Sequence, residues 1–198
     1  MIPAAHHLVM PAEPAYVPPV TASLLTAEDL LYLHLPDKQA ELVKGVLIVR
    51  EPPGARHGQV AMELGRLVAN HVADYRLGTV YAAETGFTLR RNPDTVRAPD
   101  VAFVRRDRVP EVDRTGYPDL APDLVIEVLS PGDRPGAVLA KVADWLDAGT
   151  RLVWVVDPER RSARVYREDG TETTLAPEDS LDGETVLPDF SCPLRTIL

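Results

Sequence analysis

The amino-acid sequence predicts an α/β fold in which a mixed central sheet is flanked by helices. Segments with helical periodicity alternate with short runs rich in β-branched residues along most of the 198 residues. A strand over 123–129, a helix over 136–148 and a strand over 151–157 have the lengths of a right-handed βαβ unit. We therefore expect residues 23–198 to form a single α/β domain.

The first half of this domain is expected to contain two helices and several strands. Thr26 and the acidic residues after it predict the start of a short helix, which Pro36 ends. Residues 40–51 predict two short strands joined by a tight turn at Lys44 and Gly45. Apolar residues at helical spacing predict a long helix over 56–76. Further strands are expected over 79–89 and 98–104.

The second half begins with a proline-rich loop that leads into the strand over 123–129. The helix over 136–148 is followed by Gly149, which suits the position after a helix end. Strands are expected over 151–157 and 162–168, and short strand signals near 171–175 and 184–187 predict a C-terminal β meander. Residues 1–22 are rich in proline and predict an extended or disordered arm.

Charge and composition limit the functions that this chain can have. The net charge of −9 at pH 7 argues against a large basic surface that holds nucleic acid by phosphate contacts alone. A local basic patch remains open, because seven arginines fall between residues 90 and 114. No apolar run approaches the roughly 18 residues of a membrane span. Cys192 is the only cysteine, which excludes an internal disulfide and favours a cytoplasmic protein.

Glu127 stands in the middle of the apolar strand over 123–129, where a carboxylate is costly to bury. If the strand that begins near Asp100 lies beside it, the two acids face each other at about 5 Å. Two close carboxylates stay ionised only when a cation lies near them. Because Mg²⁺ binds one or two carboxylates together with water and phosphate, the pair predicts a magnesium site.

Three further residues are candidates for the same site. Lys141 borders the buried stripe of its helix, from which it can reach Glu127 and help to orient or deprotonate a metal-bound water. Glu41 is a candidate for an outer-shell or second-metal acid. His57, after Pro-Pro-Gly-Ala-Arg, is a candidate proton acceptor or phosphate contact.

Each of these residues also has a purely structural interpretation. Glu127 is equally well explained by pairing with an arginine, and Asp100 by capping a turn. Lys141 is explained by a solvated helix flank, His57 by a helix cap, and Glu41 by pairing with Lys44. The combination of Asp100, Glu127 and Lys141 is more specific than any one of them.

Several segments together resemble the Uma-two family of restriction-endonuclease-like proteins, within the PD-(D/E)XK nuclease superfamily. They read YLHLPDKQAELVKGVLIVREPPGARHGQV, RAPDVAFV, APDLVIEVLSPGDR and AKVADWLDAGTRLVWVVDPERRSARVYR. The resemblance as a whole runs from about residue 24 to the C-terminus. The resemblance implies a restriction-endonuclease-like fold and hydrolysis of DNA phosphodiester bonds that depends on Mg²⁺, with Mn²⁺ as a substitute. A homodimer is the oligomeric state to expect from such enzymes.

The resemblance also implies roles for particular residues. Asp100 and Glu127 match the metal-binding acids, and Glu41 and His57 match further characteristic positions. The superfamily places a lysine two residues after the second acid, where this chain has Leu129. Lys141 is then the lysine that has moved to the next helix.

Two other functions fit the sequence. One is a nuclease fold that has lost catalysis and binds nucleic acid or protein. The other is a metal-dependent hydrolase of another phosphoester, such as a nucleotide, which leaves plasmid DNA intact.

Overall fold

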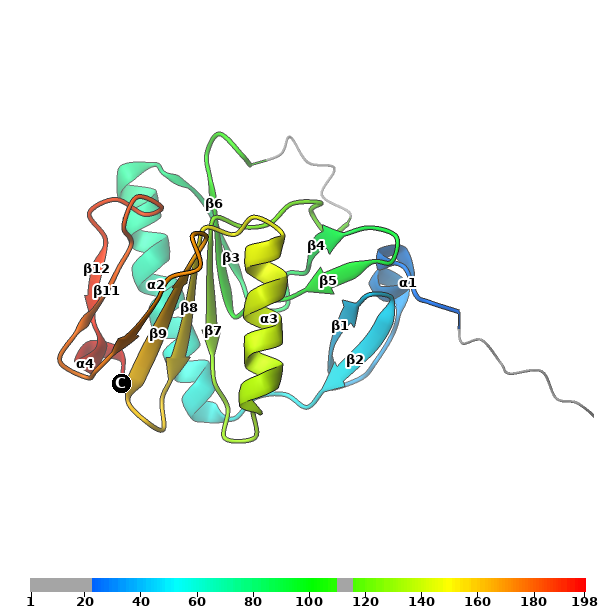
Figure 1. Cartoon of the computed structure of the whole chain (residues 1–198), viewed down its shortest axis with the longest axis horizontal. Coiled ribbons are helices and arrows are strands. Elements are labelled where there is room, and N and C mark those ends of the chain that lie inside the picture. Colours follow the sequence, from blue (N-terminus) through cyan, green and yellow to red (C-terminus); the bar gives the residue numbers. More distant parts are fainter. Residues whose placement is uncertain (1–22, 110–115) are drawn as a thin grey trace, which may run out of the picture.

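The computed structural model describes residues 23–109 and 116–198 and has an α/β architecture (Figure 1). The residues predicted to form an N-terminal arm, 1–22, lie outside this part of the chain. The described helices are α1 (Ala27–Tyr32), α2 (Ala55–Tyr75), α3 (Pro135–Asp147) and α4 (Leu194–Ile197). The strands are β1 (Gln39–Val43), β2 (Val46–Arg50), β3 (Gly78–Ala82), β4 (Phe87–Arg90), β5 (Thr95–Arg97), β6 (Val101–Arg105), β7 (Leu124–Val128), β8 (Leu152–Asp157), β9 (Ser162–Arg167), β10 (Glu172–Leu175), β11 (Ser180–Asp182) and β12 (Ser191–Pro193).

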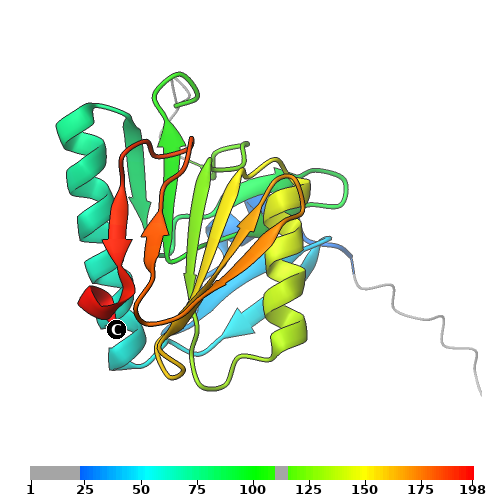
Figure 2. The same ribbon diagram turned by 60° about the vertical axis from the view of Figure 1, so that its left-hand side comes forward.

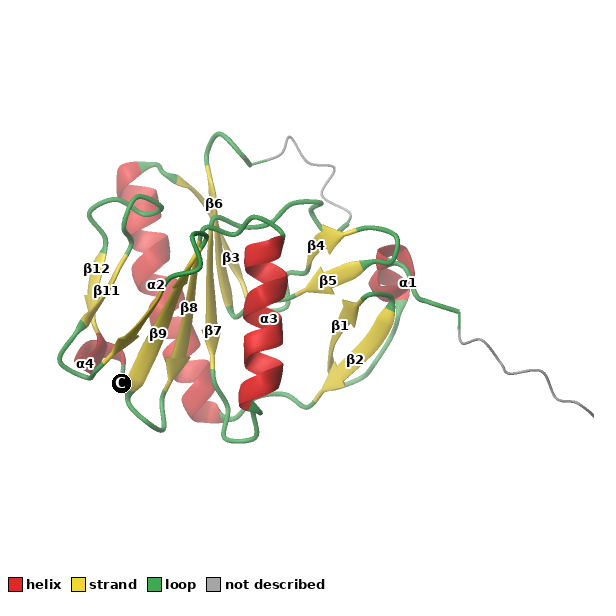
Figure 3. Cartoon of the chain, in the orientation of Figure 1, coloured by secondary structure: helices red, strands yellow, loops and turns green. Residues whose placement is uncertain are grey.

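The main sheet has six strands in the order β10-β9-β8-β7-β6-β3. Strands β7 and β8 are parallel and are joined through α3, which confirms the predicted βαβ unit. The other neighbouring pairs are antiparallel, so the sheet is mixed as expected. Figure 3 distinguishes the strands of this sheet from the helices beside it.

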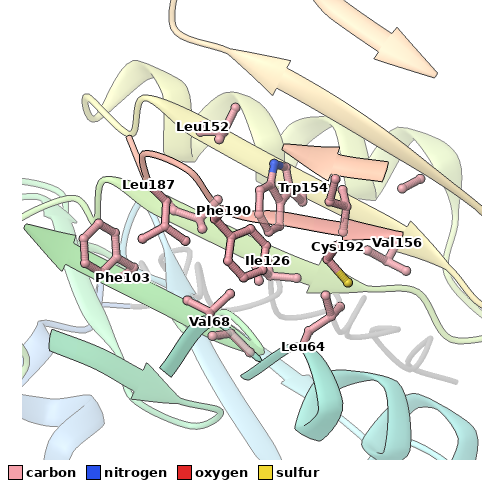
Figure 4. Close-up of a cluster of buried hydrophobic side chains, with 14 of the residues drawn as sticks. Leu64, Val68, Phe103, Ile126, Leu152, Trp154, Val156, Leu187, Phe190 and Cys192 are labelled. Carbon is pink, nitrogen blue, oxygen red and sulfur yellow. The ribbon is translucent and has the colours of Figure 1, made fainter. Parts of the chain in front are cut away.

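Helices α2 and α3 cover opposite faces of the main sheet (Figures 1 and 2). Successive residues of a strand point to opposite faces. In β7, Leu124 and Ile126 accordingly pack with α2, whereas Val125 packs with Val142 and Trp145 of α3. The larger core lies on the α2 side, where Trp154 stacks on Phe190 and the ring centroids are 5.7 Å apart (Figure 4). The sheet is therefore buried on both faces.

A second sheet of four strands, β2-β1-β5-β4, lies beside α3 (Figure 1). Strands β1 and β2 form the predicted hairpin, and both of its turn residues have positive φ, 51° for Lys44 and 77° for Gly45. This conformation is typical of a type I′ turn. Thr26 caps α1, as predicted, in a reciprocal pair of hydrogen bonds with Asp29. The helix ends at Tyr32 rather than at Pro36.

The single strand predicted over 79–89 is wrong, because the chain forms two strands there that belong to different sheets. Between β3 and β4, Glu84 has a φ of 72° and turns the chain away from the main sheet. Gly86 follows, and a Cβ there would lie 2.6 Å from the ring of Tyr117. Strand β5 lies between the segments predicted as strands, where none was expected, and pairs with both β4 and β1.

The C-terminal prediction is partly wrong. Strand β10 forms where a strand was expected, but residues 184–187 form none. Instead, β11 and β12 pair as a separate hairpin around this segment. Val186 and Leu187 are buried as loop residues that anchor the hairpin on the main core. These residues are apolar because they are buried in the core, and not because they belong to a strand.

No helix in the described ranges 23–109 and 116–198 combines the length and the hydropathy needed to cross a membrane.

The packing of α2 gives a prediction for stability. Leu64 is fully buried against the main sheet, whereas Met62 on the same helix is 69% exposed. Leu64→Ala should lower the free energy of unfolding by about 2–5 kcal/mol through lost contacts and a cavity. Met62→Ala should change it by less than about 0.5 kcal/mol. Urea denaturation measures both, and similar effects for the two variants would contradict the packing.

Candidate active site

A pocket of about 710 Å³ opens between α3 and the β1–β2 hairpin. The start of α2 and the loop before α3 also line it, and Figure 1 shows these elements next to one another. Neither α2 nor α3 has a side-chain cap on its first backbone N–H groups. All five candidate residues from the sequence line this pocket: Glu41, His57, Asp100, Glu127 and Lys141.

Asp100 and Glu127 come together because β6 and β7 are antiparallel neighbours. Val101 pairs with Ile126, so the same register continued by one residue sets Asp100 opposite Glu127. Asp100 Oδ2 accepts a hydrogen bond of 2.7 Å from the backbone N–H of Val128. The Asp100 side chain thus links the start of β6 to the backbone of β7 and does not cap a turn.

Lys141 is buried, with a side chain only 10% exposed, and its ammonium group lies among three acceptors. Its Nζ is 2.8 Å from Glu127 Oε2, 3.1 Å from Glu41 Oε1 and 3.0 Å from the carbonyl oxygen of Ala98. An ammonium group has three N–H donors, so this arrangement uses them all. Lys141 therefore joins two carboxylates from different sheets and is not a solvated flank residue.

Glu41 is held from the opposite side by Arg97, which the sequence did not single out. Arg97 Nη1 donates to Glu41 Oε2 at 2.9 Å, and Arg97 Nε donates to Asp144 Oδ2 at 2.9 Å. The backbone N–H of Ala98 donates to Glu41 Oε1 at 2.9 Å. Glu41 thus pairs with Arg97 and Lys141 rather than with Lys44. The network ties the second sheet to α3.

Trp145 has a second role besides packing in the core. Its indole N–H donates to Glu127 Oε1 at 2.9 Å, while the ring is fully buried. Trp145 and Lys141 lie one helical turn apart on α3, so both reach the same carboxyl group. Glu127 is therefore held through both oxygens by α3, with a lysine and an indole in place of an arginine.

His57 lies in the first turn of α2 and contacts Asp100 rather than capping its own helix. Its Nε2 is 3.2 Å from Asp100 Oδ2. The hydrogen bond to Asp100 raises the pKa of His57, although burial opposes this shift. His57 thus shares Asp100 Oδ2 with the backbone N–H of Val128.

Burial raises the pKa of Glu127 to about 7, because the charge of Lys141 only partly offsets burial and the repulsion of Asp100. At Glu41, burial is outweighed by Lys141, Arg97 and the N–H of Ala98, so the pKa of Glu41 is lowered. Burial is likewise outweighed at Lys141, whose pKa is raised by Glu127 and Glu41. Lys141 therefore stays charged, while Glu127 is the acid that holds a proton most easily.

The charges of the cluster explain why Glu127 is the group that titrates. The acids are Glu41, Asp100, Glu127 and Asp144, and the cationic groups are Arg97, Lys141 and protonated His57. Four carboxylates thus face two permanent cations and one histidine, so the carboxylates outnumber the cationic groups. Protonation of Glu127 reduces this excess negative charge, and a bound divalent cation would offset it.

The donor set fits a hard divalent cation with few protein ligands. Within the described residues, no group of three or more His, Cys, Asp or Glu side chains is placed to hold a metal ion. Mg²⁺ keeps several water ligands and is commonly bound by one or two carboxylates together with phosphate. Asp100 and Glu127 provide such a pair at the pocket wall.

The basic patch suggested by the arginines of residues 90–114 is largely neutralised. Arg97 is buried in the network with Glu41 and Asp144. Acidic partners also pair with Arg91, Arg105 and Arg108. Arg114 lies outside the described residues. A broad arginine surface for DNA is therefore not supported.

The pKa of Glu127 makes stability depend on pH. In the unfolded chain this carboxyl has its ordinary pKa of 4.5, and in the folded protein the value is about 7. The contribution of Glu127 protonation to the free energy of unfolding is thus fully present below pH 4.5, and it is lost as pH rises through 7. Glu127→Gln removes this titration. The free energy of unfolding of the variant, relative to that of wild type, should therefore rise by about 2–4 kcal/mol between pH 4.5 and pH 8.

Urea denaturation in EDTA at several pH values measures this difference. The control is Glu168→Gln, which makes the same change at an exposed glutamate. A pH-independent difference for Glu127→Gln would contradict the raised pKa.

Comparison with known proteins places this architecture in a family. The family "Uma2: Putative restriction endonuclease" matches residues 27–195. A solved structure described as "a putative nuclease belonging to DUF820 from Anabaena variabilis ATCC 29413" superposes with a TM-score of 0.76 at 21% sequence identity. The alignment covers 87% of this chain and 97% of that protein, and at this identity it shows a shared fold. No curated protein matches the sequence. The family match covers most of the chain, including every residue of the pocket cluster, and the chain therefore belongs to the Uma2 family.

Proposed function

We propose that this protein is a metal-dependent endonuclease that hydrolyses DNA phosphodiester bonds. Membership of a family described as restriction endonucleases points to a nuclease. The observation that carries the proposal is the convergence of Asp100, Glu127 and Lys141 in one pocket, with Lys141 Nζ 2.8 Å from Glu127 Oε2. Asp100 comes from the segment before β6, Glu127 from β7 and Lys141 from α3. Structural stability does not require two acids and a lysine to meet at an accessible cavity.

Asp100 and Glu127 are the residues that would hold the metal ion, Mg²⁺ or in its place Mn²⁺. When bound, such an ion lowers the pKa of a coordinated water and offsets charge on the phosphate. The backbone N–H of Val128 and the ring of His57 fix Asp100 from two directions. Trp145 fixes Glu127 through its other oxygen, so both carboxylates are oriented before a ligand arrives.

Lys141 is proposed to stabilise negative charge on the phosphate and to orient the attacking water. All three of its N–H donors already have acceptors, so direct donation to substrate requires it to leave one of them. The carbonyl of Ala98 is the neutral acceptor and therefore the weakest partner of the three. Lys141 keeps its ion pairs with Glu41 and Glu127 if it exchanges that carbonyl for substrate.

Glu41 and His57 assist through the residues that they contact. Glu41 is 5% exposed and its oxygens accept from Arg97, Lys141 and Ala98, which suits an anchor for Lys141 better than a ligand of a second metal. His57 orients Asp100, and it lines the pocket where it can contact phosphate.

Two further properties remain predictions from the sequence. A homodimer is the expected oligomeric state. A cytoplasmic setting agrees with a single cysteine, Cys192, which is buried.

Nicking of supercoiled plasmid tests the proposed activity. Wild type should nick it with Mg²⁺ or Mn²⁺ and not in EDTA, and Glu127→Gln and Lys141→Ala should each lower the rate by at least about 10²-fold. Arg160→Ala, at an exposed position of the β8–β9 turn, is the matched control and should keep wild-type activity. Cleavage that survives Glu127→Gln would contradict the assignment. Turnover of mononucleotides without nicking would favour the phosphoester hydrolase instead.

Metal affinity should depend on pH in a defined direction. Because the pKa of Glu127 is raised to about 7, the metal must displace a proton at lower pH. Mn²⁺ affinity should therefore rise with pH, by roughly tenfold per unit below pH 7, and level off above it. Calorimetry in two buffers of different ionisation enthalpy measures both the affinity and the proton released. Binding without proton release at pH 6 would contradict this account.

A further inference from the structure

We propose that the pocket admits an unpaired DNA strand, such as the stretches that negative supercoiling opens in plasmid, and excludes a paired duplex, with its apolar wall covering an unstacked base. This inference rests on the proposed nuclease function and names the substrate class of the same site. Three properties of the pocket carry it: the depth of the reactive groups, the limited volume, and an apolar wall next to the acids.

The reactive groups lie well below the molecular surface. The side chains of Lys141, Glu127 and Asp100 are only 10%, 12% and 14% exposed. A phosphate must therefore enter the pocket to reach them. The phosphates of a duplex are fixed on the outside of a wide rod, so one of them descends only if its strand leaves the helix. Enzymes that modify a base face a related problem, and they act on single strands or on flipped nucleotides.

The volume of the pocket, about 710 Å³, falls within the range of roughly 300–1,000 Å³ found for sites that enclose small molecules. That range suits one or two nucleotides. It does not suit a duplex segment, whose major groove alone is about 12 Å wide. The pocket is thus sized for a short stretch of one strand.

The wall opposite α3 is apolar, although it lies beside a charged cluster. It is made by leucines of α1 and of the segment that follows, together with Ile48 of β2. Leu31 and Leu33 are 36% and 40% exposed there and belong to none of the buried clusters. Leucine side chains offer nothing to a phosphate, whereas the face of an unstacked base gains from apolar contact. In a duplex the bases are stacked on one another, and this wall would meet sugar and phosphate.

The charge around the pocket also favours one strand over two. Of the basic residues that line it, Lys38 already pairs with Glu51 and Arg50 with Asp133. Arg134 at the start of α3 has no ion pair within the described residues. One free arginine and the uncapped helix starts can accompany a single phosphate backbone. A net charge of −9 disfavours binding of a second phosphate backbone.

Cleavage of matched oligonucleotides tests the inference. The probes are a 30-nucleotide single strand, the blunt duplex of the same sequence, and that duplex with a single-stranded tail, all with Mn²⁺. The single strand should be cut at least tenfold faster than the blunt duplex, and cuts in the tailed probe should fall in the tail.

Two double variants isolate the apolar wall. Leu31→Ser with Leu33→Ser should raise KM for the single strand at least fivefold and leave kcat nearly unchanged. Val46→Ser with Val49→Ser is the matched control, because these valines are 53% and 46% exposed on β2 and do not line the pocket. The control should leave KM unchanged. Equal effects of the two double variants would show that the leucines do not contact substrate.

The outcomes separate this inference from the proposed function. Blunt duplex cut as fast as the single strand would overturn the inference and leave the nuclease in place. Failure to cut any of the probes or plasmid would overturn the nuclease. In that case, fluorescence anisotropy with a labelled 12-nucleotide strand and its duplex, in Ca²⁺, still tests the pocket. Equal affinity for the two probes would contradict it.

Discussion

The burial of one carboxylate, Glu127, in the middle of a central strand governs the arrangement of the rest of the site. A charge in that position needs compensating partners, and α3 provides them with Lys141 and Trp145. Lys141 in turn forms a salt bridge with Glu41, whose negative charge is also balanced by Arg97. The cost of burying one acid is thus spread over a network that reaches both sheets. The cluster still has more carboxylates than cationic groups, and a divalent ion can offset this excess negative charge.

The architecture explains how residues far apart in sequence meet. Strands β6 and β7 set Asp100 opposite Glu127, while the crossover through α3 brings Lys141 over the same face. The second sheet adds Glu41 and Arg97 and forms the far wall of the pocket together with α1. The salt bridge between Arg97 and Asp144 joins this sheet to α3 through a partly buried ion pair. The two walls of the pocket are therefore linked by the same network that holds the reactive groups.

Much of this site was predictable from sequence because its signals are local or follow from strand pairing. Glu127 interrupts an apolar run, Asp100 opens the strand that pairs with it, and Lys141 borders the stripe of its helix. Arg97, Asp144 and the indole N–H of Trp145 were missed because their roles depend on contacts across 18 to 56 residues of sequence. The division of residues 79–89 was missed for a related reason. A turn at Glu84 and the close approach of Tyr117 to Gly86 decide it, and neither changes the strand-like composition of the segment.

The central claim is that Asp100 and Glu127 together hold a divalent cation, and the most direct test is to locate that ion. Crystals soaked in Mn²⁺ near pH 8 can be measured at the manganese absorption edge, where anomalous scattering identifies the metal. The account predicts one strong anomalous peak in contact with carboxylate oxygens of both residues, and no such peak in Glu127→Gln crystals. A peak elsewhere in the molecule, or an ordered site with Lys141 still on Glu127 and no manganese beside it, would contradict the claim.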